Sequence, residues 1–307
     1  MGRDACQISQ AARAVFEESD DVLGFALSKL CFEGPDEALL PTEVQQPAIL
    51  AASVAWLRAL EERCGGIRAA YVAGHSLGEY TALVASRALG LRDALRLVRA
   101  RGLYMRDAAP PGTGAMAAIL GCERGVVEAA CERARAQTGE VVEPANFNAP
   151  AQTVVAGTVA AVQAACEAAR AAGARRARPL PVSAPFHCSL MAPAAERLAR
   201  DLAGVALADP DPPVIANVTA EPNARAACIS DLLTRQVAAP VRFTESVERL
   251  ASLGVTRVLE VGPGRVLTGL VARIVPSLRR ANLGCAGELD AAADFVTRPA
   301  ADAKPAG

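Results

Sequence analysis

The chain has 307 residues, of which 52% are hydrophobic, and a formal net charge of −1. This length allows a large core, in one big domain or two unequal ones, and the balanced charge excludes a global field that would attract nucleic acid or a membrane surface. The nine cysteines include no C-x-x-C pair, so we expect neither a disulfide framework nor a metal site. Because there is no apolar run long enough for a bilayer and no signal peptide, we expect a cytoplasmic protein.

Short Val, Ile and Leu strands alternate with longer helical stretches along the chain, beginning with its first third. The predicted elements are helices at 11–31 (interrupted near Gly24), 46–63, 79–87 and 91–108, and a strand at 69–73. This alternation predicts an α/β fold with a hydrolase-like core and a parallel sheet.

Residues 112–182 have the pattern of a smaller unit. Its predicted elements are a strand at 116–121, a helix at 123–136, a strand at 153–157, a helix at 158–172 and a strand at 177–182. This order predicts a ferredoxin-like α+β subdomain that is inserted between two parts of the larger domain.

The chain then returns to the larger domain, which we expect to comprise residues 1–111 and 183–285. Its later predicted elements are helices at 191–203, 243–253 and 265–275 and strands at 213–217 and 256–261. Residues 286–307 are rich in Ala, Asp and Pro, a composition that predicts a disordered tail.

Gly74-x-Ser76-x-Gly78 lies between a predicted strand and a predicted helix, which is the setting of a nucleophile elbow. A serine at the tip of such a tight turn is strained, and flanking glycines remove the side chains that would clash there. The following helix points its free N–H groups at the same spot. We therefore expect Ser76 to be a nucleophile and the backbone N–H of Leu77 to stabilise an oxyanion.

A serine nucleophile needs a base, and the chain has two histidines. His75 adjoins Ser76, where neighbouring side chains project in different directions, so we expect it to pack or cap locally. His187, in a loop after a predicted strand, is the predicted base. The sequence marks no carboxylate that would orient this histidine, and four candidates stay open: Asp201, Asp209, Asp211 and Glu260. A Ser–His dyad would suit a thioester, because a thiolate leaves more readily than an alkoxide or an amine.

Seven sequence motifs follow one another along the chain: GHSLGEY (74–80), RGLYM (101–105), GTGAMAAILG (112–121), NFNAPAQTVVAG (146–157), PLPVSAPFHCSLM (179–191), RQVAAPVRF (235–243) and EVGPGRVLTGL (260–270). Together, and in this order, they resemble the malonyl-CoA:acyl carrier protein transacylases of fatty-acid synthesis and the related acyltransferase domains of polyketide synthases. The resemblance extends from about residue 1 to 285. The resemblance implies an [acyl-carrier-protein] S-malonyltransferase. Such an enzyme moves malonyl from malonyl-CoA to the phosphopantetheine thiol of acyl carrier protein through a Ser76 ester, and it needs no cofactor.

The resemblance also implies roles for single residues. Ser76 matches the acylated serine and His187 its partner histidine. Gln236, in RQVAAPV, matches a residue whose backbone carbonyl holds that histidine. Arg101 matches the arginine that binds the malonyl carboxylate, a task that suits a planar guanidinium because it makes two parallel bonds to a carboxylate. The alternative for Arg101 is a solvated helix face.

Further matches concern the mouth of the site and the carrier protein. Phe186 resembles the residue of malonyl-selective relatives, where a bulky side chain limits the room for an α-methyl group. Asn146 and Asn148 resemble polar residues near the mouth of the family's site, although turn chemistry around Pro150 is an alternative. A basic cluster before His187 could dock the acidic carrier protein or form an ordinary solvated loop; it consists of Arg175, Arg176 and Arg178.

The chain departs from the family at its start. Relatives open with an apolar strand and a GQGSQ segment whose glutamine donates a second oxyanion hydrogen bond, whereas this chain begins MGRD, and Gln7 and Gln10 fall within the first predicted helix. One hypothesis, which we prefer, is that Met1 is an internal methionine of a longer protein. The other is a true truncation, which would leave strand edges unpaired and cost about a hundred- to thousandfold in rate.

Two other functions stay open. A serine esterase or thioesterase would use the same elbow with water as the acceptor, and would need a carboxylate near His187 but not Arg101. A truncated, inactive carrier-protein-binding module is the third possibility. For the leading hypothesis we expect malonyl-CoA and acyl carrier protein as partners, no nucleic acid or membrane, and a monomer; the choice between fatty-acid and polyketide synthesis stays open.

Overall fold

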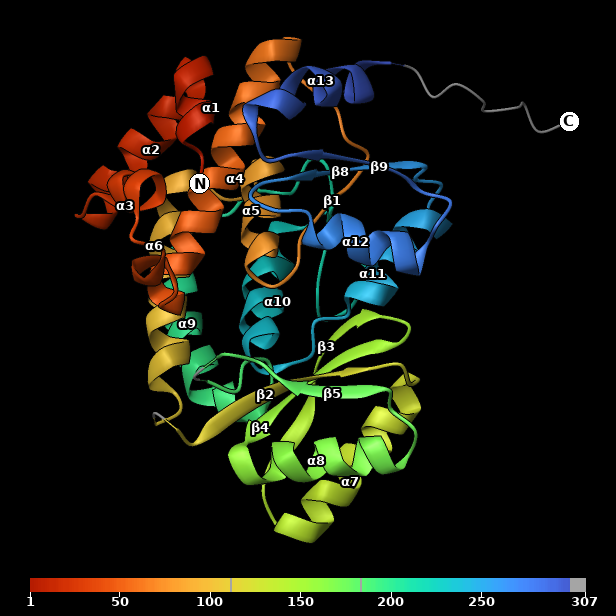
Figure 1. Cartoon of the computed structure of the whole chain (residues 1–307). Helices are drawn as coiled ribbons and strands as arrows, with labels where there is room; N and C mark the ends of the chain where they lie inside the picture. The colour runs from red at the N-terminus through yellow and green to blue at the C-terminus, as the bar shows by residue number, and fades with distance from the viewer. Residues whose placement is uncertain (111, 183, 299–307) are drawn as a thin grey trace, which may run out of the picture.

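The computed structural model describes residues 1–110, 112–182 and 184–298. A large unit of helices with parallel strands lies above a smaller unit with a four-stranded antiparallel sheet (Figure 1). The first third of the chain builds most of the helical side of the large unit. Its elements are α1 (Arg3–Ile8), α2 (Gln10–Leu23), α3 (Leu27–Glu33), η1 (Asp36–Leu39), α4 (Thr42–Cys64), α5 (Leu77–Ala85) and α6 (Leu91–Asp107).

The parallel strands of the large unit lie in two separate sheets. In one, β1 (Val72–Ala73) pairs in parallel with β6 (Val214–Ile215), which pairs antiparallel with β7 (Pro222–Asn223). In the other, β8 (Arg257–Val261) pairs in parallel with β9 (Arg279–Leu283). The predicted α/β class with parallel strands is confirmed. Within the described residues, β1 and β8 each pair along one edge.

Helices from the second half of the chain complete the large unit. They are η2 (Ser189–Met191), α9 (Ala192–Leu202), α10 (Ala226–Ala238), α11 (Phe243–Ser252), α12 (Val266–Ile274), η3 (Ala286–Glu288) and α13 (Leu289–Thr297). Neither α10 nor β9 was expected from the sequence. The helix α10 matters most for function because it carries Gln236, whose side chain is fully buried.

The prediction of disorder from residue 286 onward is wrong for the described part of that segment. Residues 289–297 form α13, which packs against α4 (Figure 1). Its apolar residues recur at helical spacing and face the core; they are Leu289, Ala292, Ala293 and Val296. The bias toward Ala and Asp concealed this amphipathic pattern. Residues 299–307 lie outside the described ranges, so the prediction stays untested for them.

The smaller unit lies within the predicted range 112–182. Its elements are β2 (Gly114–Leu120), α7 (Arg124–Thr138), β3 (Val142–Ala149), β4 (Gln152–Thr158), α8 (Val159–Ala171) and β5 (Arg176–Pro179). The strand order is β3-β4-β2-β5 with every pair antiparallel, and α7 and α8 lie together on one face of the sheet (Figure 1). This is the expected ferredoxin-like arrangement.

One strand of this sheet, β3, was not predicted from the sequence. It contains Pro144, Asn146 and Asn148, residue types that are depleted in strands. The ladder between β3 and β4 shifts register after Pro144 and again after Phe147, which accommodates the irregular sequence. The strand matters because it brings both asparagines to the boundary with the large unit, where Asn146 forms a bridge with Val241.

The helices α4 and α6 approach each other closely, and this brings two buried side chains of the site, Arg101 and Gln46, into contact. A Cβ atom at Gly102 would lie 2.5 Å from the Cα atom of Glu43, so only glycine permits this distance between the helices. The neighbouring residue Arg101 is thereby held against α4, where its guanidinium meets the side chain of Gln46.

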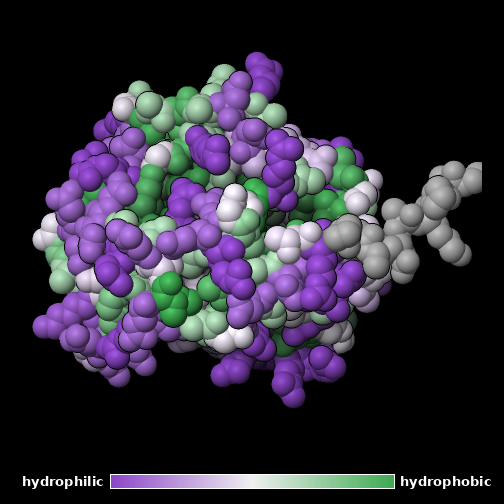
Figure 2. Space-filling model, turned by 90° about the horizontal axis from the view of Figure 1, so that it is seen from above, coloured by the Kyte–Doolittle hydropathy of each residue, from purple (hydrophilic) through white to green (hydrophobic). Residues whose placement is uncertain are grey.

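Hydrophilic side chains cover much of the face seen from above, with hydrophobic ones in small groups between them (Figure 2). Among the helices that the structure describes, none combines the length and apolar character needed to cross a bilayer.

Candidate active site

Ser76 lies at the tip of the sharp bend between β1 and α5. Its backbone φ of 51° is in the left-handed region, where a residue with a Cβ atom is strained. The bend also requires glycine at position 74, because a Cβ atom there would lie 2.0 Å from the backbone of Gly78. The backbone N–H of Leu77, the first residue of α5, donates to no acceptor within the described residues. It is therefore free to donate to an oxyanion that forms beside Ser76.

His187 reaches Ser76 from the loop before η2. The Oγ atom of Ser76 and the Nε2 atom of His187 are 2.7 Å apart, and the Nδ1 atom of His187 is 2.8 Å from the backbone oxygen of Gln236. A carbonyl oxygen can only accept, so Nδ1 carries a hydrogen and donates to it. This contact leaves the lone pair of Nε2 facing the serine hydroxyl, which is the tautomer that a general base requires.

The protonation state of His187 follows from its surroundings. The side chain is buried, and burial, together with the positive charge of Arg101, lowers its pKa from the ordinary value to about 3. Both causes disfavour the imidazolium ion. In the free protein His187 is therefore neutral across the physiological pH range and able to take the hydroxyl proton of Ser76.

Arg101 is a buried cation beside the nucleophile, with an exposed fraction of 2%. Its guanidinium donates to Ser76 Oγ at 2.9 Å, to the side-chain oxygen of Gln46 at 2.7 Å and to that of Gln236 at 2.9 Å. Within the described residues it forms no ion pair, and its Nε–H has no hydrogen-bond partner. The alternative of a solvated helix face is wrong, and a buried guanidinium without a directly bonded anion favours an anionic ligand.

Three residues of this network were not identified from the sequence: Gln46, Glu79 and Asn217. Asn217 follows β6, the strand beside β1. Its side chain accepts from the backbone N–H of Ser76 at 2.7 Å and donates to the carbonyl of Gly74 at 2.7 Å, which fixes the elbow. Its position directly after a strand that neighbours β1 is the signal that could have found it.

The four carboxylates that the sequence left open do not complete a triad. Within the described residues, none of them forms a hydrogen bond with His187: Asp201, Asp209, Asp211 and Glu260. Asp201 accepts instead from the hydroxyl of Tyr104, and Glu260 accepts from backbone N–H groups that open α12. The backbone of Gln236 takes the place that a carboxylate has in a Ser-His-Asp triad.

The second histidine turns away from the nucleophile, as expected. The Nε2 atom of His75 is 2.7 Å from the side-chain oxygen of Asn148, and its ring packs beside Phe243. Asn146 is buried on the same strand, β3. Neither asparagine belongs to a turn at Pro150; both lie on β3, and Asn148 contacts the elbow through His75.

Phe186 precedes His187 and is half-buried against both the large core and a small cluster under the subdomain sheet. The three arginines proposed for docking lie at the outer edge of that sheet, on or next to β5. All of them are exposed: Arg175, Arg176 and Arg178. The structure thus separates them from the buried network around Ser76.

Comparison with known proteins identifies the family to which this chain belongs. The family model "Acyl transferase domain" matches residues 1–291. The chain is 48% identical over 277 residues to malonyl CoA-acyl carrier protein transacylase of Salmonella typhimurium, covering 90% of this chain and 89% of that protein. It is 45% identical to the Bacillus subtilis protein of the same name over 274 residues, covering 89% of this chain and 86% of that protein.

Solved structures of proteins with similar names also resemble this chain in fold and in sequence. The acyl-carrier-protein S-malonyltransferase of Burkholderia pseudomallei has a TM-score of 0.91 at 47% identity, with 94% of both chains covered. A malonyl-transacylase in complex with its type II polyketide-synthase acyl-carrier protein has a TM-score of 0.92 at 44% identity, with 96% of this chain and 94% of that chain covered. The chain therefore belongs to the acyl transferase family and, within it, to the malonyl CoA-acyl carrier protein transacylases.

Proposed function

We propose that this protein transfers a malonyl group from malonyl-CoA to the phosphopantetheine thiol of acyl carrier protein, through an ester on Ser76. Membership of the family supports the reaction class. The observation that carries the assignment of the substrate is the guanidinium of Arg101, buried without an ion pair among the described residues and donating to the nucleophile itself.

In the first half-reaction, Oγ of Ser76 attacks the thioester carbonyl while Nε2 of His187 takes the hydroxyl proton. The backbone N–H of Leu77 stabilises the oxyanion. The carbon–sulfur bond then breaks, and the coenzyme A sulfur leaves with the proton from His187. The backbone carbonyl of Gln236 holds the imidazolium ion between these steps.

The second half-reaction reverses these roles with a new thiol. His187 takes the proton of the pantetheine thiol of the carrier protein, and the sulfur attacks the ester carbonyl. The ester bond breaks, and Ser76 recovers its proton from His187. Throughout both half-reactions, the malonyl carboxylate pairs with the guanidinium of Arg101, which lies 2.9 Å from Oγ of Ser76.

Arg101 also explains why an acid is preferred over a neutral acyl group. A neutral acyl group gives the buried guanidinium no directly bonded anion, whereas the malonyl carboxylate provides one. We further propose that Phe186, beside His187, restricts space next to the α-carbon, and that Asn146 and Asn148 line the approach to the elbow.

The arginines at 175, 176 and 178 are proposed to attract the acidic carrier protein, since they are exposed at one sheet edge and make no ion pair within the described residues. We also propose that the protein acts as a monomer, because every residue assigned to the reaction comes from one chain.

An esterase with water as acceptor fits the site less well. Such an enzyme gains from a carboxylate that orients the histidine, and within the described residues His187 donates to a backbone carbonyl. It would also have no use for a buried guanidinium at the nucleophile. An inactive binding module is harder still to reconcile with a serine and a neutral histidine 2.7 Å apart.

Intact-protein mass spectrometry after incubation with malonyl-CoA tests the proposal. We expect the mass of one malonyl group on the wild-type protein, none on Ser76→Ala, and loss of the added mass when holo acyl carrier protein is supplied. Arg101→Met should lower malonylation about thirtyfold or more, the cost of removing one partner of a buried charge pair. Loss of the acyl group to water as fast as to the carrier protein would favour the esterase, and no mass gain on wild type would favour the inactive module.

A further inference from the structure

Glu79 is a buried carboxyl group that none of the transfer steps uses. It lies in the first turn of α5, three residues after the nucleophile, with an exposed fraction of 2%. Burying a carboxyl group without hydrogen-bond partners costs free energy, so Glu79 should have partners that offset this cost. Two hydrogen bonds to its side chain provide them.

Both partners of Glu79 belong to the machinery around Ser76. Its Oε2 atom accepts from the side-chain N–H of Gln236 at 2.7 Å and from the backbone N–H of Asn217 at 3.1 Å. The same Gln236 nitrogen also donates to the backbone carbonyl of Ser76 at 2.9 Å. The other end of that amide, the oxygen, accepts from Arg101 at 2.9 Å.

This arrangement gives the Gln236 amide one favourable orientation. The nitrogen must face Glu79 and the carbonyl of Ser76, because both offer only acceptors there. The oxygen must then face Arg101, which offers only donors. If the amide turned over, donors would meet donors at Arg101 and acceptors would meet acceptors at Glu79.

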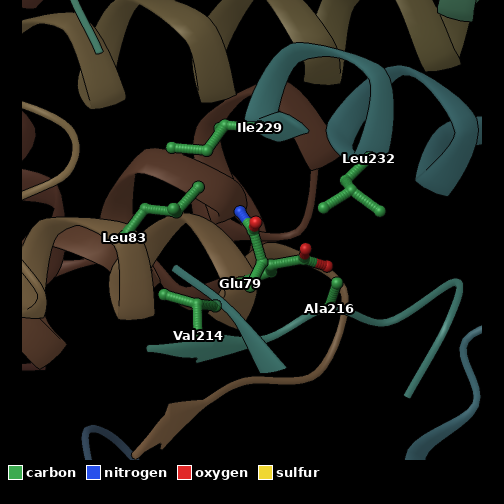
Figure 3. A pocket seen from close by; sticks show the side chains of 7 residues that line it. Glu79, Leu83, Val214, Ala216, Ile229 and Leu232 are labelled. Atoms are coloured by element: carbon green, nitrogen blue, oxygen red, sulfur yellow. The ribbon is translucent and has the colours of Figure 1, made fainter. Parts of the chain in front are cut away.

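On its other side Glu79 faces a small cavity that is lined mainly by apolar side chains, with Asn223 as the polar exception. This cavity of about 10 Å³, no larger than one water molecule needs, separates α5 from α10 and β6. Figure 3 shows Leu83, Val214, Ile229 and Leu232 around Glu79. Within the described residues, the two hydrogen bonds that Glu79 accepts come from Gln236 and Asn217, on the side of the elbow.

We propose that Glu79 is a positioning residue for substrate selection: by holding the Gln236 amide in one orientation, it aims the Arg101 guanidinium at the acyl carboxylate. This inference rests on the proposed malonyl transfer. It predicts that Glu79 acts on carboxylate-bearing thioesters more than on neutral ones, although it touches neither substrate.

The acceptor at Oε2, rather than the negative charge, is what this role requires. Burial raises the pKa of Glu79 to about 7, and a proton on Oε1 leaves Oε2 able to accept both bonds. A glutamine at position 79 can present its oxygen in the same place. Methionine, of similar length, cannot accept either bond.

The test measures acylation of Ser76 by malonyl-CoA and by acetyl-CoA, as rates of mass gain, in wild type, Glu79→Met and Glu79→Gln. We expect Glu79→Met to lower the malonyl-to-acetyl rate ratio about tenfold, the scale of one lost hydrogen bond to a charged group. Glu79→Gln should restore a ratio close to that of wild type. Thermal melting checks that each variant is folded.

Gln236→Met provides the second arm if Glu79→Met does not fold. It keeps the backbone carbonyl that holds His187 but removes the amide, so the ratio should fall in the same way. Equal losses of malonyl and acetyl transfer would assign Glu79 a purely structural role and overturn the proposal. So would a Gln variant as impaired in the ratio as the Met variant. If wild type takes up no malonyl group, the proposed function itself fails.

Discussion

The two units of this protein bury very different kinds of residue. Behind the elbow, the large unit encloses a connected set of polar side chains, among them Glu79, Arg101 and Gln236. Between the sheet and the two helices of the smaller unit, the buried core consists of Ala, Val, Ile and Cys side chains. Each polar group in a dry interior needs a hydrogen-bond partner to offset the cost of its burial, whereas an apolar core needs only to be filled.

The difference indicates how the protein divides its tasks. The network behind the elbow sets which proton moves and which charge is recognised, so substitutions there should change rates and selectivity. The core of the smaller unit holds β3 and β5 in place, so substitutions there should change stability and leave the chemistry intact. The predictions below test this division.

The largest effect is expected from the catalytic base. Replacing His187 by alanine removes the acceptor for the Ser76 proton and should lower the rate of malonylation about a thousandfold. The matched control is His75→Ala, which removes the other histidine, 2.7 Å from Asn148 rather than from the nucleophile. Intact-protein mass spectrometry of samples quenched at successive times would measure both rates of malonylation. Similar losses in the two variants would show that His187 is not the base.

A core substitution in the smaller unit should separate stability from rate. Ile119 is fully buried on β2, and Ile119→Ala should lower the free energy of unfolding by about 2–5 kcal/mol, with Ile119→Val costing about 0.5–1.5 kcal/mol. Urea titration measures both. The folded Ala variant should malonylate at close to the wild-type rate. If the malonylation rate of this variant fell as far as that of a variant in the polar network behind the elbow, the two units would not divide stability and chemistry between them.

A smaller effect is expected at the exposed sheet edge. Replacing Arg175, Arg176 and Arg178 by alanine should raise the KM for acyl carrier protein several-fold, and less so at high salt, because exposed charges mainly steer association. Malonylation by malonyl-CoA should not change. Arg133→Ala, another exposed arginine of the same unit, serves as the control; an equal change in KM would argue against a docking surface.

The smallest effect concerns pH. An ordinary histidine gains its proton near pH 6.5, but the pKa of His187 is lowered to about 3 by burial and by Arg101. A lowered pKa means that the neutral base persists as the pH falls. We therefore expect kcat/KM for malonylation to stay level from about pH 7.5 to about pH 5.5. A decline centred near pH 6.5 would contradict the buried, neutral histidine.

Much of the chemistry was predictable from the sequence because it resides in local patterns. A G-x-S-x-G turn between strand and helix identified Ser76, and the presence of two histidines narrowed the base to His187. Arg101 and Gln236 could be assigned only through resemblance, since Arg101 lies among other arginines of a predicted helix and no element was predicted around Gln236. Their significance arises from contacts with Ser76 across 25 and 160 positions of the chain.

The remaining gaps have physical causes. Asn217 follows a strand of two residues, too short for a periodic signal. Glu79 sits where acidic residues commonly favour a helix N-terminus, so its burial was not apparent. One proline and two asparagines concealed β3, and an Ala- and Asp-rich composition concealed α13, because tertiary packing overrode local preference in both.

The most direct test of the account is a crystal structure of the protein trapped with malonyl on Ser76. We predict that the malonyl carboxylate lies within hydrogen-bonding distance of the Arg101 guanidinium, with the ester carbonyl oxygen toward the N–H of Leu77. A carboxylate that points to solvent, with Arg101 still bonded only to Gln46 and Gln236, would contradict it.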